Sequence, residues 1–263
     1  MDIEESDLLG FAKSNGEFIG IREFIHADKG ESKVPRIVFE HGASSYSDVA
    51  EFDSITSDIS SFAIGLSLVQ SFKYFQCVPR DDIKKFLSLR DDVIKEAREK
   101  IVSPALTKDK HTICVHIRRG DFLSSPYHMP STENFTLQAT QYLAGRAPSS
   151  SVLVVLFGTE TTWTTDLFNR SSLNFALAGE AVKRKYAAIA EWQFSSDHCD
   201  VVLLTASAST FGWWLGFLSK GQRVYYNVVY EKKKGAFKSF HPDDFFPPEW
   251  KPLQLVNGTI VEV

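Results

Sequence analysis

Residues 114–122 read CVHIRRGDF, a hydrophobic run that passes through His116 and ends in two adjacent arginines, Arg118 and Arg119. The run begins earlier, as TICVHI, and is apolar enough to form a buried strand. Three similar runs follow it along the chain: SVLVVLF, DVVLLTA and RVYYNVV. Continuous Val, Ile and Leu runs are typical of parallel strands that are covered on both faces.

Helical patterns separate these runs, at 131–144, 179–192 and 210–219. Strands that alternate with helices predict an α/β fold, and residues 110–263 are therefore expected to form a Rossmann-like domain. The segment SPALTKDK at 103–110 has no period and is the expected boundary. Residues 1–109 are expected to form another α/β domain, with RIVFE and SLVQSFKYF as strand or strand-to-loop candidates and an amphipathic helix at 81–101.

Composition limits the classes of partner. The chain has 263 residues, a formal net charge of -4 and a pI near 6.0, so no overall positive field attracts nucleic acid. No stretch approaches the roughly 20 apolar residues of a membrane helix, and the acidic start MDIEESDLLG is unlike a signal peptide. The chain as written is expected to be soluble.

Cysteines and glycosylation triplets give information on the cellular compartment of the protein. Cys77, Cys114 and Cys199 cannot all pair within the chain, and the expectation is buried free thiols. The triplet Asn-X-Ser/Thr begins at Asn134, Asn169 and Asn257, which are candidates for N-glycosylation on a secretory route.

The arginine pair is the first feature with chemical content. Ligands of open parallel sheets bind beyond the carboxyl ends of the strands, where Arg118 and Arg119 are expected to lie. Guanidinium groups are permanently charged forks that match phosphate oxygens, so the pattern predicts an anion site. The alternative is a surface pair held by Asp121 for structural reasons.

The stretch DVVLLTASASTFGWWLGFLSKG at 200–221 is the second feature. A buried strand leads to Ser207, Ser209 and Thr210 and then to an apolar helix. The free backbone N–H groups and the positive dipole end at such a helix start suit a phosphate. The alternative is plain capping, with Trp213 and Trp214 packed on the sheet.

Two common phosphate-binding patterns are absent from the sequence. It contains no G-x-x-x-x-G-K-[ST] loop, which argues against an ATPase, and no D-x-D to hold a divalent cation against a sugar nucleotide. The arginines would then neutralise a departing diphosphate themselves, and no metal cofactor is expected.

These residues carry a family resemblance. VHIRRGDF is similar to the H-x-R-R-x-D motif of the α1,2-, α1,6- and protein O-fucosyltransferases. STFGWW, FHPDDFFPPEW at 240–250 and VQSFKYF resemble the α1,2 class, glycosyltransferase family 11. The resemblance covers roughly residues 60 to 252.

The resemblance implies two Rossmann-like domains facing a cleft and an inverting, metal-independent transfer of L-fucose from GDP-fucose to a galactose-terminated glycan, in α1,2 linkage. Carried over by position, Arg118 and Arg119 would bind the diphosphate and His116 would help to position the donor. Ser209, Thr210 and Phe211 would form the second wall of the donor site. A Golgi location, at the membrane or in the lumen, is also implied.

The acceptor hydroxyl needs a base, and Asp121 is the nearest candidate along the sequence, with His128 as an outside choice. Asp121 has an equally good structural role as the partner of the arginines. The Gly-Gly-x-Gly-Asn-type segment of the family, and the Golgi anchor of its animal members, have no match before VQSFKYF. Residues 1–109 are therefore expected to lack the first strand and Gly-rich loop of an acceptor-side domain. The alternative function is an inactive member or fragment that binds only nucleotide or glycan.

Overall fold

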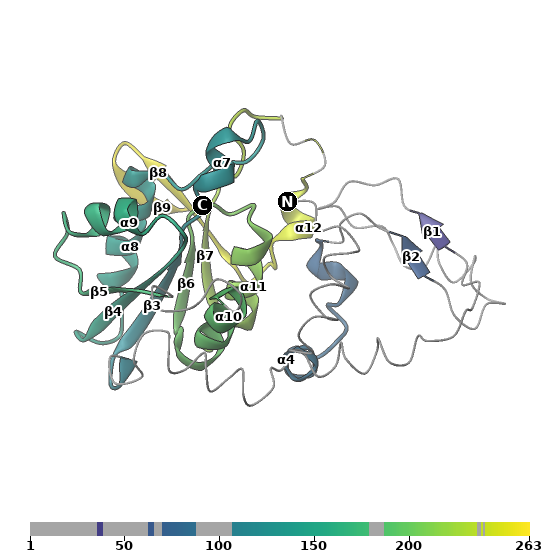
Figure 1. Cartoon of the computed structure of the whole chain (residues 1–263), viewed down its shortest axis with the longest axis horizontal. Coiled ribbons are helices and arrows are strands. Elements are labelled where there is room, and N and C mark those ends of the chain that lie inside the picture. Colours follow the sequence, from purple (N-terminus) through teal and green to yellow (C-terminus); the bar gives the residue numbers. More distant parts are fainter. Residues whose placement is uncertain are drawn as a thin grey trace. The chain divides into compact units, whose positions relative to one another are not determined.

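A seven-stranded sheet organises the carboxyl-terminal part of the chain in the computed structural model (Figure 1). The structure describes residues 36–38, 63–65, 70–87, 107–178, 187–235, 238 and 240–263. The strands of the sheet are β3 (His111–His116), β4 (Val152–Phe157), β5 (Phe175–Leu177), β6 (Val201–Leu204), β7 (Arg223–Asn227), β8 (Lys251–Val256) and β9 (Thr259–Glu262). Their order is β5-β4-β3-β6-β7-β8-β9, and only β9 runs antiparallel to its neighbour.

The strand order is that of a Rossmann sheet. Counted from β3, the first six strands lie in the order 3-2-1-4-5-6, so the chain crosses over between β3 and β6. The four strands expected from the sequence are β3, β4, β6 and β7, and the predicted α/β class is confirmed. The short strand β5 and the β8–β9 hairpin were not predicted.

Helices cover both faces of the sheet (Figure 1). The helices α8 (Glu133–Ala144) and α9 (Thr161–Phe168) lie on one face, and α10 (Ala187–His198) and α11 (Thr210–Leu218) lie on the other. The predicted helices at 131–144 and 210–219 correspond to α8 and α11. The one predicted at 179–192 is observed as α10, and residues 179–186 lie outside the described part. The helix α9 was not predicted.

The two-residue period of β3 divides its side chains between these helix layers. Ile113 and Val115 pack with Phe135 and Ala139 of α8 in the main hydrophobic core. Cys114 and His116 point to the opposite face, toward α10 and α11. Because both faces are covered, every residue of β3 after His111 is buried, which explains its uninterrupted apolar sequence.

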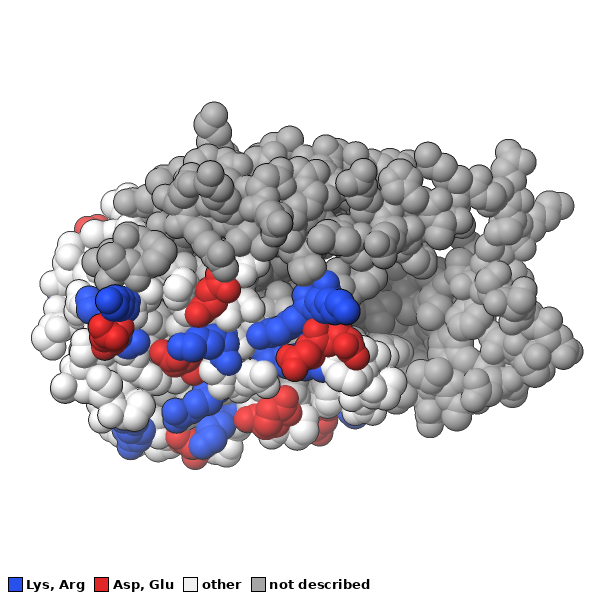
Figure 2. Space-filling view, turned by 90° about the horizontal axis from the view of Figure 1, so that it is seen from below, with Lys and Arg blue, Asp and Glu red and all other residues white. Residues whose placement is uncertain are grey.

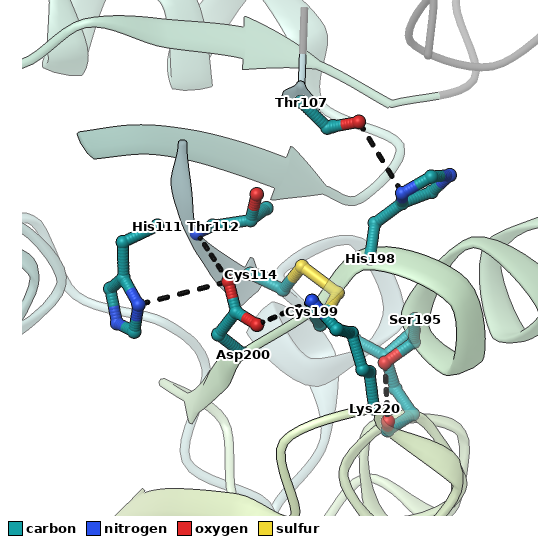
Figure 3. Close-up of a disulfide and its surroundings, with 10 residues drawn as sticks. Thr107, His111, Thr112, Cys114, Ser195, His198, Cys199, Asp200 and Lys220 are labelled. Carbon is teal, nitrogen blue, oxygen red and sulfur yellow. Dashed lines mark hydrogen bonds and ion pairs between the residues drawn. A yellow bond between two sulfur atoms is a disulfide. The ribbon is translucent and has the colours of Figure 1, made fainter. Parts of the chain in front are cut away.

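A disulfide joins Cys114 of β3 to Cys199, which lies between α10 and β6 (Figure 3). Both cysteines have no exposed surface. The expectation of buried free thiols is therefore wrong for this pair, although right about their burial. Cys77 remains a free thiol and is exposed, not buried. The two bonded cysteines are 85 residues apart, and they meet because β3 and β6 are neighbouring strands.

Asp200, the next residue, holds the same corner by polar contacts (Figure 3). Its carboxylate accepts hydrogen bonds from Thr112 N at 2.9 Å and from Lys220 Nζ at 2.8 Å. These contacts lower the pKa of Asp200, against the opposing effect of its burial, so the carboxylate is charged at neutral pH. The start of β3 is thus fixed to the turns that precede β6 and β7.

The described residues form two compact units. The sheet belongs to residues 91–237 with 249–263, and the other unit contains residues 1–90 with 238–248. The described elements of that other unit are β1 (Arg36–Val38), β2 (Ala63–Gly65), η1 (Phe72–Tyr74), α4 (Arg80–Phe86) and α12 (Pro242–Phe245).

Within this unit β1 and β2 pair in parallel, and α4 accounts for the start of the predicted helix at 81–101. Residues 72–74, in a stretch expected to be a strand or a strand-to-loop segment, form a 3-10 helix. Lys73 Nζ lies 2.6 Å from Asp244 Oδ1. The predicted lack of a first strand and Gly-rich loop falls largely on residues outside the described part. This lack and the predicted division at 109/110 both stay predictions.

The charged side chains seen in Figure 2 are mixed in sign. On this face, which is turned away from the short helix α7 (Gly120–Ser124), basic and acidic groups lie side by side among the described residues. Such a face presents no field of one sign. Among the described helices, none combines the length and hydropathy needed to cross a bilayer.

Candidate donor-binding site

Both features that the sequence analysis singled out lie at the crossover of the sheet. Arg118 and Arg119 follow β3, and Ser209 and Thr210 follow β6, which is the strand next to β3. A crossover between strands 1 and 4 is where Rossmann sheets bind ligands, because the connections lead away in opposite directions and leave a crevice. The structure therefore brings the two predicted anion-binding features to one edge of the sheet.

A buried Ser–Thr pair fixes the end of β3. Ser131 Oγ accepts a hydrogen bond from Arg118 N at 2.9 Å and lies 2.6 Å from Thr205 Oγ1. The Thr205 hydroxyl donates to His116 O at 2.7 Å. Neither hydroxyl-bearing residue has exposed surface, so these bonds form away from competing water. The backbone before the two arginine side chains is consequently well fixed.

Arg118 is held by a fork-to-fork ion pair with Asp121. Arg118 Nε and Nη2 each donate to one Asp121 carboxylate oxygen, both at 2.8 Å. The hydrogen bond from Arg118 is the main reason that the pKa of Asp121 lies below its usual value. The structure thus places Asp121 in the arginine-anchoring role that the sequence left open. Its role as a catalytic base stays a prediction.

Arg119 has a different set of contacts. Arg119 Nε donates to Glu160 Oε2 at 2.9 Å, and Nη1 donates to Ser131 O at 2.9 Å. The guanidinium carbon lies 4.2 Å from the centre of the Trp163 ring, a cation–π distance. The two arginines are adjacent in sequence, yet their side chains are oriented by separate partners.

Sequence reasoning missed Glu160, which lies between β4 and α9. Gly158 lets this turn pass close to β3: its φ is +153°, and a Cβ there would lie 2.6 Å from Ile117 O. The usable signal was a Gly-Thr-Glu sequence directly after a buried strand. Its relevance to Arg119 appears only once β4 is known to pair with β3.

The start of α11 forms the second part of the site. Ser209 is the N-cap, and its Oγ accepts a hydrogen bond from Gly212 N at 3.3 Å. Thr210 and Phe211 are partly exposed in the first turn. The Phe211 ring stacks on Trp192 of α10 with 5.4 Å between centres, and Phe211 O accepts from Trp192 Nε1 at 3.2 Å. Ser207 is fully buried and donates to Asn227 O, so its hydroxyl serves the scaffold.

His116 lies behind this turn and is 2 % exposed. Its Nε2 is 3.4 Å from Ser209 Oγ, and its Nδ1 has no hydrogen-bond partner among the described residues. Burial, and secondarily the charge of Arg118, lowers the pKa of His116 to about 3. The ring is therefore neutral at physiological pH, and its predicted part in positioning the donor is as a neutral group.

Glu191 of α10 is a second buried titratable group that the sequence analysis did not identify. It is 9 % exposed, and desolvation raises its pKa to about 8. At neutral pH the carboxyl group is consequently mostly protonated. It adjoins Trp192 in sequence, so it lies on the helix whose indole contacts Phe211.

His128, the outside choice for the base, packs beside the arginine loop. Its ring lies 4.5 Å from the Phe122 ring, and its Nδ1 is 2.9 Å from Ser125 Oγ. Burial lowers its pKa, so it is neutral at pH 7.

Lys232 from the loop after β7 donates to Leu123 O at 2.7 Å and to Ser125 O at 2.6 Å, and so holds the end of α7. The described residues contain no cluster of three His, Cys, Asp or Glu groups that could hold a metal ion.

Comparison with known proteins identifies the family. The model of glycosyl transferase family 11 matches residues 50–254, and this chain therefore belongs to that family. A galactoside 2-alpha-L-fucosyltransferase of Caenorhabditis elegans is 35% identical over 214 residues, which are 73% of this chain and 52% of the relative. Galactoside alpha-(1,2)-fucosyltransferase 1 of Oryctolagus cuniculus is 24% identical over 211 residues, or 72% of this chain and 52% of the relative. The chain thus spans about half the length of these relatives.

Solved structures give a more distant likeness. The alpha-1,6-fucosyltransferase NodZ, co-crystallized with GDP, has a TM-score of 0.46 and 11% identity, covering 81% of this chain and 62% of NodZ. POFUT1 in complex with GDP has a TM-score of 0.38 and 8% identity, covering 78% of both chains.

Proposed function

We propose that this chain binds GDP-fucose at the β3–β6 crossover and transfers L-fucose to the 2-hydroxyl of a galactose-terminated glycan, with inversion and without a metal ion. One observation carries the proposal: a pair of arginines and a helix amino terminus lie together at the crossover of a Rossmann sheet. The chain belongs to family 11, and its relatives include galactoside 2-alpha-L-fucosyltransferases. Both facts support a GDP-sugar as the anion that binds at this site.

In this proposal the diphosphate is bound by charge and by backbone donors. Arg118 and Arg119 supply two permanent positive charges, and the first turn of α11 after Ser209 supplies N–H groups and the positive end of the helix dipole. Thr210 and Phe211 form the wall that the donor contacts. His116 supports that wall from behind, because its ring lies against Gly212 and near Ser209.

The negative charge that develops in the transfer step lies next to the same arginines. The acceptor oxygen bonds to the anomeric carbon of fucose while the bond from that carbon to the β-phosphate oxygen breaks. The electron pair leaves with GDP, and the hydroxyl proton passes to a base. Negative charge therefore grows on the phosphate in the transition state, where fixed guanidinium groups stabilise it most effectively.

Asp121 is the proposed base, and its link to Arg118 would couple proton transfer to donor binding. Arg118 is the main cause of the lowered Asp121 pKa. A diphosphate that takes over the Arg118 fork removes that cause, so the Asp121 pKa rises and the carboxylate becomes a stronger base. Asp121→Asn should then abolish transfer while GDP binding persists. Transfer by this variant at the parental rate contradicts the base role.

The proposed compartment is the Golgi lumen. The Cys114–Cys199 disulfide supports an oxidising environment, because such bonds are rare in the reducing cytosol. The Asn residues of the three glycosylation triplets are all exposed, and Asn257 lies in the turn between β8 and β9. Secretion from insect cells followed by N-glycosidase treatment should lower the protein's mass, and Asn257→Gln should remove one glycan. An unchanged mass would argue against glycosylation.

Product analysis tests the function as a whole. The purified chain is incubated with GDP-fucose and a panel of galactosides in EDTA, and the linkage of any product is determined. The expected product carries α1,2-linked fucose. Arg119→Ala should weaken GDP binding in calorimetry by roughly 1.5 to 3 kcal/mol, the worth of a charge-assisted contact. Unchanged affinity in this variant, or an absolute need for Mn²⁺, contradicts the proposal that the arginines bind the diphosphate without a metal ion. GDP binding without transfer identifies a binding-only member.

A further inference from the structure

Glu160 connects the turn after β4 to the arginine loop after β3. One carboxylate oxygen accepts from Arg119 Nε at 2.9 Å, and the other accepts from Gly120 N at 2.8 Å. A single side chain thus fixes both the guanidinium of Arg119 and the backbone of the next residue. Because β4 and β3 are paired strands, this contact joins two adjacent parts of the sheet edge.

The guanidinium of Arg119 is restrained on three sides. Glu160 binds Nε, Ser131 O accepts from Nη1, and the Trp163 ring lies against the guanidinium carbon. No hydrogen bond within the described part of the chain uses Nη2. The arrangement therefore leaves one nitrogen of a well-oriented cation for a ligand.

Arg118 differs from Arg119 in which of its nitrogens are already bound. Its Nε and Nη2 already form the two-pronged contact with Asp121, which is the geometry that a phosphate would use. Arg118 must exchange partners before it can bind a phosphate in that way. Arg119 needs no such exchange, because Glu160 contacts a different nitrogen from the one left for a ligand.

We propose that Glu160 is a positioning residue for the donor: it orients Arg119 so that Nη2 faces the diphosphate. This inference rests on the proposed function. A free arginine side chain loses considerable rotamer entropy when it binds a ligand. Because Glu160 already restrains Arg119 in the folded protein, this entropy is lost on folding and not on ligand binding.

The negative charge of Glu160 acts in the opposite direction, because it lowers the positive potential at the site. The Glu160 side chain is 31% exposed, so solvent screens this charge. Orientation by two charge-assisted hydrogen bonds is short-ranged and unaffected by that screening. We therefore expect the loss of Glu160 to weaken GDP binding.

A double-mutant cycle with GDP as the probe tests the proposal in the full chain. Glu160→Ala should weaken GDP binding about tenfold, and Glu160→Gln, which keeps one acceptor oxygen, should weaken it less. In the Arg119→Ala background Glu160→Ala should have almost no further effect, because its target is gone. A purely structural role would not show this dependence on Arg119.

Glu133→Ala is the matched control. Glu133 of α8 pairs with Arg170, which follows α9, at 2.9 Å, the same distance as in the Glu160 pair, but both side chains are exposed. It should leave GDP affinity unchanged. Thermal melting of every variant checks folding, and Glu160→Gln replaces Glu160→Ala if the latter does not fold.

The outcomes separate the inference from the function on which it rests. Unchanged or tighter GDP binding by Glu160→Ala, with Arg119→Ala weakened, overturns the positioning role alone. An equal loss in both backgrounds also overturns it, because Glu160 would then act through Gly120 or another group. If Arg119→Ala itself binds GDP normally, the proposed donor site fails.

Discussion

The imidazole of His116 lies directly against Gly212, with no space between them for a side chain. A Cβ at residue 212 would come within 2.7 Å of His116 Nδ1 and 2.9 Å of its Cε1. The absence of a side chain therefore lets the first turn of α11 approach β3, and this approach brings Ser209 to the arginine edge.

Gly212→Ala is expected to destabilise the protein by about 2 kcal/mol, the usual effect of forcing a methyl group into a packed interior. GDP affinity should fall as well, because the added methyl group pushes the start of α11 away from β3. Chemical denaturation and calorimetry measure the two effects. Gly145→Ala is the control, because its Cβ would meet nothing closer than 3.4 Å. Equal stability of the two variants would contradict this account of the packing.

The stability of the protein should fall as pH rises through the neutral range because of Glu191. Burial raises its pKa to about 8 in the folded protein from the ordinary value of 4.5. Between these values the unfolded chain loses the proton while the folded chain keeps it, so stability decreases as pH rises. Glu191→Gln should flatten this decrease in melting temperatures measured from pH 5 to 8. A parallel decrease in the variant contradicts the buried neutral carboxyl.

His116 should have the opposite effect at acid pH. Its folded pKa is about 3, against the ordinary value of 6.5, so the unfolded chain binds the extra proton first as pH falls. The stability that neutral His116 contributes is complete above about pH 6.5 and is lost progressively toward pH 3. His116→Gln should weaken this loss in the same melting series. If the stability of the variant falls as steeply toward acid pH as that of the parent, groups other than His116 cause the loss.

The disulfide should contribute about 2 to 4 kcal/mol to stability, since it closes a long loop in the unfolded chain. Changing both Cys114 and Cys199 to Ala should lower the denaturation midpoint, and Cys77→Ser should not. Alkylation of the denatured but unreduced protein, followed by mass spectrometry, should label Cys77 alone. Labelling of all three cysteines would show that the bond does not form.

Ser209 and Thr210 should separate capping from donor binding. Ser209→Ala removes the acceptor for Gly212 N and should cost about 1 kcal/mol of stability. Thr210→Ala should lower GDP affinity more than stability, because Thr210 is partly exposed in the first turn of α11. If both variants lose only stability and bind GDP as the parent does, Ser209 is only a cap and Thr210 serves only the helix.

The sequence was most informative where one continuous segment carries the signal. The strands at 112–117 and 200–206 were predictable because each is a single buried run, and the arginines follow directly in the same segment. The antiparallel hairpin of β8 and β9 was harder to predict, because Pro252 interrupts the pattern and both strands are partly exposed.

Features that depend on strand order could not be predicted in this way. Glu160 contacts Arg119 only because β4 pairs with β3, and Cys114 meets Cys199 only because β6 pairs with β3. A hydrophobic run reveals that a strand is buried but carries no information about its neighbours. The contacts that hold the arginines in place therefore required the structure.

The Cys114–Cys199 bond has a consequence for how the chain matures. A ribosome delivers Cys77 and Cys114 well before Cys199, and those two are only 37 residues apart (114 minus 77). The shorter loop is the easier one to close, so in an oxidising lumen a mismatched Cys77–Cys114 bond has the first opportunity to form. The native bond then requires thiol exchange, with exposed Cys77 as the leaving thiol. An oxidoreductase that catalyses this exchange would speed formation of the native bond, and replacing Cys77 would remove the competing pair.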